Sequence, residues 1–138
     1  MKNVFIDTNI LIDLLANREP FSKFAIEIFD KAEKNKVKLY TSSHAYATTY
    51  YLLKKHLKEA ELRVILISLL DFISIIAVDL PVIRRSLLSD HKDFEDAIQI
   101  FAANTIKSLD FIVTRNVKDF KNAGVAVVPP DELLFYLK

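Results

Sequence analysis

Polar side chains that can bind a metal ion occur at three separated places in this sequence. Asp7 directly follows a short apolar run, Asp96 lies near the start of an apolar helical segment, and Asn116 follows another apolar run. Carboxylates at one edge of a fold repel one another unless a cation lies among them, and hard oxygen ligands suit Mg²⁺ or Mn²⁺. A carboxylate-bound Mg²⁺ can hold a phosphodiester and activate a water molecule. If the three places meet in space, they can therefore support metal-dependent phosphodiester hydrolysis.

The composition limits the other kinds of site. The sequence has no cysteine, which excludes thiolate metal sites, and a single glycine, Gly124, which excludes Gly-rich phosphate loops. The formal net charge of +1 provides no overall attraction to nucleic acid, so any such contact must come from local basic groups. With 138 residues and 51% hydrophobic content, the chain can fill one core, and we expect a single domain over residues 1–138.

Apolar runs and helix caps predict strands that alternate with helices. We expect strands over residues 4–6, 37–40, 75–78, 111–114 and 125–128. We expect helices from residue 8, from residue 20, over 44–56, 60–72, 93–108 and 131–137, and a short one from residue 81. Right-handed crossovers between such strands produce a parallel sheet covered on both faces. The predicted fold class is therefore α/β, a three-layer α/β/α sandwich with a parallel sheet of four to five strands.

Parallel sheets bind ligands beyond the carboxyl ends of their strands, near the point where strand order reverses. This rule brings Asp7 and the segment 114–116 to the same edge. Asp and Asn are also ordinary helix caps and turn residues, and Asp93 fits the pattern of a cap for the helix that contains Asp96. Asp96, however, shares a helix face with Ile100 and Ala103, which is an unusual place for an unpaired charge. A functional role is therefore favoured more strongly for Asp96 than for Asp93.

Three segments in this order, FIDTNILID, KDFEDAIQIFAA and FIVTRNVKDF, resemble the PIN-domain family, which includes ribonuclease toxins of the VapC type. The resemblance covers nearly the whole chain. It implies a PIN-like fold, a requirement for Mg²⁺ or Mn²⁺, cleavage of single-stranded RNA and frequent homodimerisation. The family's first Asp falls on Asp7, and its helix-opening Asp falls on Asp96.

If this site cleaves RNA, we expect the following roles for its polar residues. Asp7 and Asp96 would hold the metal, while Asn116 and either Asp93 or Glu95 would orient water. Thr8, Asn9 and Thr114, near the strand ends, would contact a phosphate of the RNA through hydroxyl, amide or backbone donors. Two basic side chains, Arg115 and Lys118, would clamp the RNA backbone.

Two positions depart from the family pattern. A Glu commonly lies within the third helix, but this chain has Thr48 or Thr49 at that place, and a late Asp is replaced by Asn116. Either metal binds more weakly than in relatives, or Asp93 and Glu95 supply the missing charge. A PIN-like module that binds RNA or a protein without cutting is therefore the main alternative.

Other enzyme classes fit the residues less well. A phosphatase of the haloacid dehalogenase kind needs a second Asp where this chain has Asn9, and a Rossmann cofactor domain needs a glycine fingerprint. The first carboxylate comes too early for a secretory signal, and the long apolar stretch over residues 64–80 is interrupted by polar residues. We therefore expect a cytoplasmic protein without a membrane segment. Its expected partners are single-stranded RNA, a second copy of the chain and, in the case of a toxin, an antitoxin protein.

Overall fold

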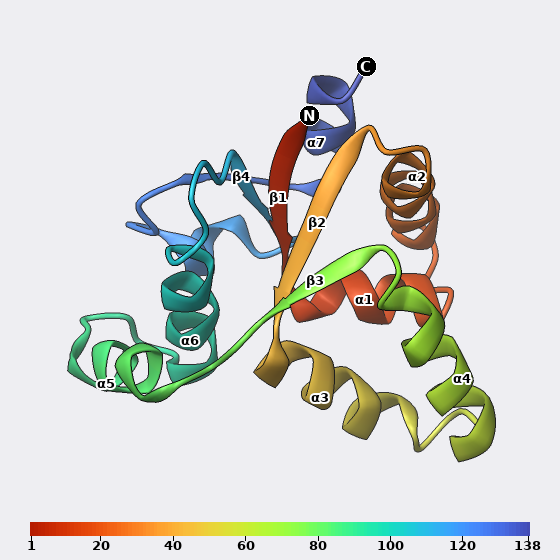
Figure 1. Cartoon of the computed structure of the whole chain (residues 1–138), viewed down its shortest axis with the longest axis horizontal. Helices are drawn as coiled ribbons and strands as arrows, with labels where there is room; N and C mark the ends of the chain where they lie inside the picture. Colours follow the sequence, from red (N-terminus) through yellow and green to blue (C-terminus); the bar gives the residue numbers. More distant parts are fainter.

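The computed structural model describes residues 1–138 and contains one five-stranded parallel sheet (Figure 1). The strand order is β3-β2-β1-β4-β5, and every neighbouring pair is parallel. The strands are β1 (Lys2–Ile6), β2 (Val37–Ser42), β3 (Ile73–Ile76), β4 (Phe111–Val113) and β5 (Ala126–Val128). The predicted α/β class and parallel sheet are confirmed.

Helices lie on both faces of this sheet. In Figure 1, α5 and α6 lie on one side of the strands, and α1 and α2 lie on the other. The helices are α1 (Thr8–Leu15), α2 (Ser22–Glu33), α3 (Ser43–Leu53), α4 (Glu59–Leu69), α5 (Leu80–Leu88), α6 (Phe94–Ala103) and α7 (Pro130–Tyr136), with a 3₁₀ turn, η1 (Val117–Phe120). None of them is both long enough and apolar enough to cross a lipid bilayer.

Alternation of side chains along β1 divides the core into two layers. Val4 and Ile6 pack with residues of α1, α2 and α7, whereas Phe5 faces the opposite layer and packs with Ile98 of α6 and Ile112 of β4. A third cluster joins α1, α3 and α4 below the sheet and contains Ile12, Leu53, Leu62 and Leu66. The two layers hold the sheet rigidly from both sides, and the third cluster anchors the helices around its carboxyl edge.

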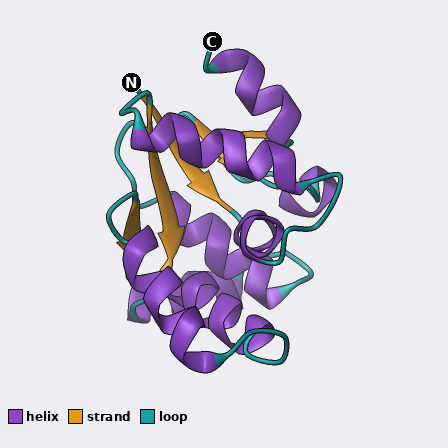
Figure 2. Ribbon diagram, turned by 90° about the vertical axis from the view of Figure 1, so that its right-hand side faces the viewer, coloured by secondary structure: helices purple, strands orange, loops and turns teal.

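The strand order reverses beside β1. The chain passes from β1 to β2 and β3 in one direction and then returns to place β4 on the other side of β1. Beyond the strand ends, the Asp7 amide donates to the Val113 carbonyl at 3.0 Å, and the Thr114 amide donates to Val128 at 3.1 Å. Both chain termini lie at the opposite end of the sheet in Figures 1 and 2. Asp7 and Thr114 are therefore neighbours at the edge where parallel sheets bind ligands.

Several predicted boundaries differ from the structure. The third strand lies two residues earlier than predicted because it pairs in register with β2, from Leu39 opposite Ile73 to Ser42 opposite Ile76. The helix predicted over residues 93–108 ends at Ala103, where the Thr105 hydroxyl donates to the Ala102 carbonyl. The helix predicted from residue 20 begins at Ser22. These shifts leave the residues of the predicted site at the same edge of the sheet.

Candidate active site

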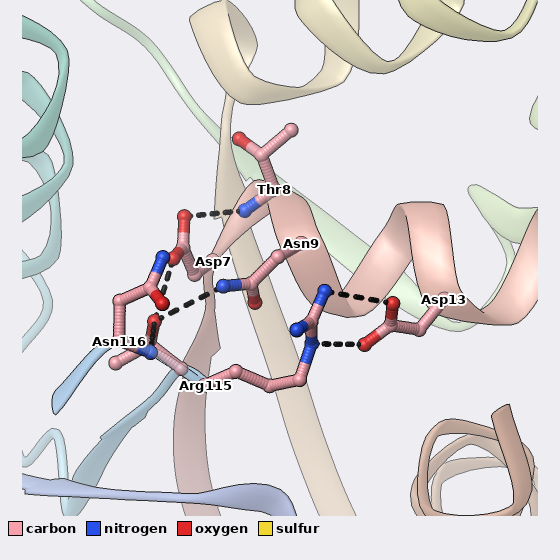
Figure 3. Close-up of polar contacts among 7 residues, drawn as sticks. Asp7, Thr8, Asn9, Asp13, Arg115 and Asn116 are labelled. Carbon is pink, nitrogen blue, oxygen red and sulfur yellow. Dashed lines mark hydrogen bonds and ion pairs between the residues drawn. The ribbon is translucent and has the colours of Figure 1, made fainter. Parts of the chain in front are cut away.

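The Asp7 carboxylate is buried at the end of β1 and is held by three donors. Figure 3 shows the contact with the Thr8 amide. Its Oδ1 accepts from the Thr8 amide and from Gln99 Nε2, both at 2.6 Å. Its Oδ2 accepts from the Thr114 hydroxyl, also at 2.6 Å. All three partners are neutral, and no Lys, Arg or His lies within ion-pair distance. The carboxylate is therefore fixed in position while its charge remains uncompensated.

The Thr114 side chain bonds to the Asp7 carboxylate. Its hydroxyl is fully buried, and besides donating to Asp7 it accepts from Asn9 Nδ2 at 3.4 Å and from the Asn116 amide at 3.0 Å. Because one hydroxyl has one donor and two acceptor sites, these bonds use its full capacity. The Thr114 side chain therefore positions the Asp7 carboxylate, and its predicted contact with RNA stays a prediction.

Gln99 is a member of the site that the sequence analysis missed. It lies on α6, one turn after Asp96, and is buried with its Oε1 lacking any hydrogen-bond partner. The available signal was an amide on the buried face of an apolar helix, at the i, i+3 spacing that places it beside Asp96. Gln99 links α6 directly to Asp7.

Asp96, in the first turn of α6, lines the same cavity as Asp7. The Asp93 side chain caps α6 by accepting from the Asp96 amide at 2.9 Å, as predicted, which fixes the first turn of the helix. The cavity has a volume of about 250 Å³ and is mostly polar. Its lining includes Asp7, Thr8, Asn9, Thr48, Glu95, Asp96, Gln99 and Asn116.

The remaining predicted residues lie around this cavity. Glu95 lines it and lies 3.8 Å from His44 Nε2, while Asp93 and Lys118 line a second polar cavity that shares Asp96 with the first. Asp119, in the 3₁₀ turn, lines this second cavity as well, and its negative charge contributes to raising the pKa of Asp96. Asp119 was not among the predicted site residues.

Both principal carboxyl groups are weaker acids than an ordinary Asp. Burial raises the pKa of Asp7, although the hydrogen bonds from Thr114, Gln99 and Thr8 and the charge of Arg115 oppose this effect. Burial, followed by the negative charges of Asp93, Asp7, Asp119 and Glu95, raises the pKa of Asp96 to about 7. Raised pKa values at two neighbouring carboxyl groups, neither of which forms an ion pair, are the electrostatic character of a cation-binding site.

Arg115 does not face this cavity. Its Nε donates to Asp13 Oδ2 at 2.7 Å and its terminal nitrogen donates to Asp13 Oδ1 at 3.1 Å (Figure 3). The guanidinium also stacks 4.1 Å from the centre of the Phe21 ring. Asp13 is 1% exposed and the Arg115 side chain 22% exposed. Arg115 therefore ties the end of β4 to α1, and its predicted role as an RNA clamp stays a prediction.

The structure also decides which Thr occupies the position of the family's usual Glu. Thr48 lines the cavity with Asp7 and Asp96, whereas Thr49 is fully buried and donates to the Ala45 carbonyl at 2.8 Å. The hydroxyl of Thr48 and the amide of Asn116 therefore line the cavity at the positions where the sequence resemblance leads us to expect carboxylates. In agreement, no three His, Cys, Asp or Glu side chains group closely enough to suggest a metal site by themselves.

The donor set nevertheless fits a small hard dication. Asp7 and Asp96 supply two carboxylates, and Asn116 supplies an amide oxygen at the same cavity. Asn9 Oδ1 and Gln99 Oε1 are buried oxygens without hydrogen-bond partners beside Asp7. Oxygen ligands and uncompensated charge suit Mg²⁺ or Mn²⁺. With only two carboxylates, the affinity for the metal should be lower than at a site with four.

The raised pKa of Asp96 predicts how stability changes with pH in the absence of metal. The folded state binds a proton more tightly than the unfolded state does, so this stabilisation is complete below about pH 4 and is lost as the pH rises through about 7. The Asp96→Asn variant cannot lose a proton at this position, so its free energy of unfolding does not fall for this reason as the pH rises. Because Asp96 is partly exposed and screened by water, we expect the variant to exceed the wild type by about 1 kcal/mol at pH 8.

Thermal unfolding in EDTA between pH 4 and 8 measures this difference. The two proteins should have similar melting temperatures at pH 4 and diverge as the pH rises. Parallel curves would show that Asp96 has an ordinary pKa and that the carboxylates are too far apart to interact.

Comparison with known proteins identifies the family. A sequence profile of the PIN domain matches residues 3–118. Ribonuclease VapC1 from Aquifex aeolicus (strain VF5) is 27% identical over 135 residues, which cover 95% of this chain and 92% of that protein. A chain in a toxin-antitoxin complex from Klebsiella pneumoniae is 27% identical, with a TM-score of 0.66 over 92% of this chain and 97% of that chain.

A more distant structure shares the fold. The sarcin-ricin loop cleaving toxin VapC20 from Mycobacterium tuberculosis is 18% identical, with a TM-score of 0.62 over 79% of this chain and 86% of that chain. The fold, the order of the motifs and the profile match over most of the sequence agree with one another. This chain belongs to the PIN-domain family.

Proposed function

We propose that this protein is a metal-dependent endoribonuclease that cuts single-stranded RNA at the Asp7–Asp96 cavity. The observation that carries the proposal is the placement of two uncompensated carboxylates, from the end of β1 and the start of α6, in one polar cavity at the carboxyl edge of the sheet. The similarity to ribonuclease VapC1 supports the same activity.

Asp7 and Asp96 would hold Mg²⁺ or Mn²⁺, with Asn116 and Glu95 at the cavity wall to orient water. Such an ion, when bound, polarises a phosphodiester, lowers the pKa of a bound water and stabilises the leaving oxygen. Gln99 and Thr114 keep the Asp7 carboxylate in one orientation through short hydrogen bonds. Preorganised groups avoid the cost of reorganisation during reaction, so these two neutral residues act as positioning residues.

The surroundings of the cavity also determine what enters it. Thr8 and Asn9, in the first turn of α1, line the cavity and supply polar groups for a phosphate oxygen. Lys118 lies in the adjoining cavity, where its charge can contact the RNA backbone. We do not assign Thr114 or Arg115 to the RNA, since their polar groups are already bonded within the protein.

The missing carboxylates lead to a prediction for a variant with increased metal affinity. Asn116→Asp restores the charge that the family pattern has at this position. One additional negative charge beside the metal should lower the Kd for Mn²⁺ by about tenfold at neutral pH, or about 1.4 kcal/mol. Isothermal titration calorimetry of the wild type and the variant tests this value. An unchanged Kd would place Asn116 outside the metal-binding set.

A manganese titration tests the proposed activity. The wild type is incubated with a mixed-sequence single-stranded RNA, the same RNA annealed to its complement, and single-stranded DNA of the same sequence. We expect cleavage of the single-stranded RNA that rises with Mn²⁺ and stops in EDTA. Binding of RNA without cleavage at any Mn²⁺ concentration would support the alternative, a PIN-like RNA-binding module, and would contradict the proposed enzyme.

We further propose that the protein acts as the toxin of a toxin-antitoxin pair, as the similarity to the Klebsiella pneumoniae complex suggests. Expression in a bacterial host should then arrest growth, and co-expression of a neighbouring small protein should relieve the arrest. Homodimerisation and a cytoplasmic location remain predictions, which size-exclusion chromatography with light scattering and cell fractionation would test.

A further inference from the structure

A larger groove lies beside the catalytic cavity and shares part of its wall. It lies between residues 12–18, at the end of α1, and residues 52–57, at the end of α3, and we call it the α1–α3 groove. Its volume is about 760 Å³. Three residues, Ile12, Arg18 and Leu52, line both the groove and the catalytic cavity. A chain that crosses Asp7 and Asp96 can therefore continue into this groove without leaving the surface.

The groove combines an apolar wall with a cationic rim. Leu15, Leu52 and Leu57 supply the wall. The rim contains Arg18 and Lys55, together with His56, and none of the three lies within 4.0 Å of a carboxylate. An apolar surface beside free positive charge matches one nucleotide of RNA, whose base is flat and apolar on its faces and whose phosphate is anionic.

The cavity on the other side of Asp96 has a different character. Lys92, Lys118 and Lys121 line it, and it has no hydrophobic lining residue. It also shares Asp96 with the catalytic cavity. Four Asp side chains, Asp90, Asp93, Asp96 and Asp119, also line this cavity, so its lysines offer positive charge to a phosphate only among carboxylates. It has no apolar surface for a base, so the two flanks of the catalytic cavity differ in the part of a nucleotide they can recognise.

We propose that the α1–α3 groove binds a base next to the cleaved phosphodiester, while the Lys118 side contacts only the RNA backbone. The inference rests on the proposed function, because it takes single-stranded RNA as the ligand. Charge complementarity at Arg18 and the wall shared with the catalytic cavity favour RNA over a protein segment. A preference for particular bases at the cut site would then arise from Leu52 and the other residues of the α1–α3 groove, and not from the cavity that Lys118 lines.

A binding experiment separates the two flanks. All variants are made in an Asp96→Asn background, which prevents cleavage, and binding is followed by fluorescence anisotropy. The probes are a labelled oligouridylate of about eight nucleotides and an abasic ribose-phosphate strand of the same length. The background protein should bind the base-bearing strand about fivefold more tightly than the abasic strand.

Each variant has its own expected signature. Leu52→Ser should reduce the preference for the base-bearing strand to less than about twofold and leave affinity for the abasic strand unchanged. Arg18→Ala and Lys118→Ala should weaken binding of both strands equally and reduce the slope of log K against log salt by about 0.7 each. Leu87→Ser, on α5, is the matched control, since Leu52 is 47% and Leu87 68% exposed. This control should change neither the preference for the base-bearing strand nor the salt dependence of binding.

The possible failures are distinguishable. If Leu52→Ser leaves the preference unchanged, or if the background protein binds no RNA, the inference is overturned. If the affinity for the base-bearing strand is unchanged in both Leu52→Ser and Arg18→Ala, the α1–α3 groove is left for a protein partner, which also overturns the inference. A wild type that shows this base preference but cuts no RNA with Mn²⁺ would instead contradict only the proposed enzymatic activity.

Discussion

Replacing Asp7 or Asp96 with Asn should reduce kcat/KM for RNA cleavage by at least about a thousandfold, because each change removes one of the two Asp carboxylates proposed to bind the catalytic metal directly. The small number of charged ligands makes the loss large, since Thr48 and Asn116 cannot compensate for it. Asp7→Asn keeps a side chain of the same shape, and burial already favours the neutral form at this position. The fold should therefore survive.

The measurement is the initial rate of cleavage of a fluorescent single-stranded RNA at saturating Mn²⁺. Asp131→Asn, on the exposed first turn of α7, is a matched control that removes a carboxylate from another part of the protein. It should retain full activity. Cleavage that persists in both Asp7→Asn and Asp96→Asn would place the reaction elsewhere or show that a contaminant cuts the RNA.

The largest expected loss of stability follows from removing Arg115. Arg115→Ala leaves the Asp13 carboxylate buried without its partner, which typically costs about 3 to 5 kcal/mol of the free energy of unfolding. For a protein of this size, that loss lowers the melting temperature by roughly 10 to 20 °C. Urea denaturation monitored by circular dichroism measures the change directly.

A compensating variant distinguishes the two possible roles of Arg115. Asp13→Asn combined with Arg115→Met removes both charges and keeps side chains of similar volume, so it should recover part of the stability. Its cleavage activity should be close to that of the wild type. A variant at Arg115 that remains stable but loses RNA binding would instead support the role as an RNA clamp expected from the sequence.

The sequence was sufficient to predict the elements that bring the site together. Apolar runs before Asp7 and before Thr114 predicted parallel strands, and strand ends at one sheet edge predicted that these positions would meet. The cap pattern predicted that Asp93 starts the helix containing Asp96. These predictions succeeded because they depend on local sequence and on the general behaviour of parallel sheets.

The partners of each side chain could not be predicted in the same way. Arg115 follows a strand in a motif that suggests an exposed cation, but Asp13, 102 residues away in the sequence, lies beside it in the fold. Gln99 and Thr114 carry no charge, and although their positions near Asp96 and at a strand end could be noted from the sequence, their hydrogen bonds to Asp7 could not be predicted. Side-chain pairing depends on long-range packing, which periodicity and spacing do not encode.

The most direct test of the metal-binding claim is a crystal of the wild type soaked in Mn²⁺ and measured for anomalous scattering from manganese. We predict an anomalous peak between the Asp7 and Asp96 carboxylates, about 2.0 to 2.3 Å from an oxygen of each, and no peak in a matched Asp96→Asn crystal. A wild-type crystal with no peak between these carboxylates at saturating Mn²⁺ would contradict the account.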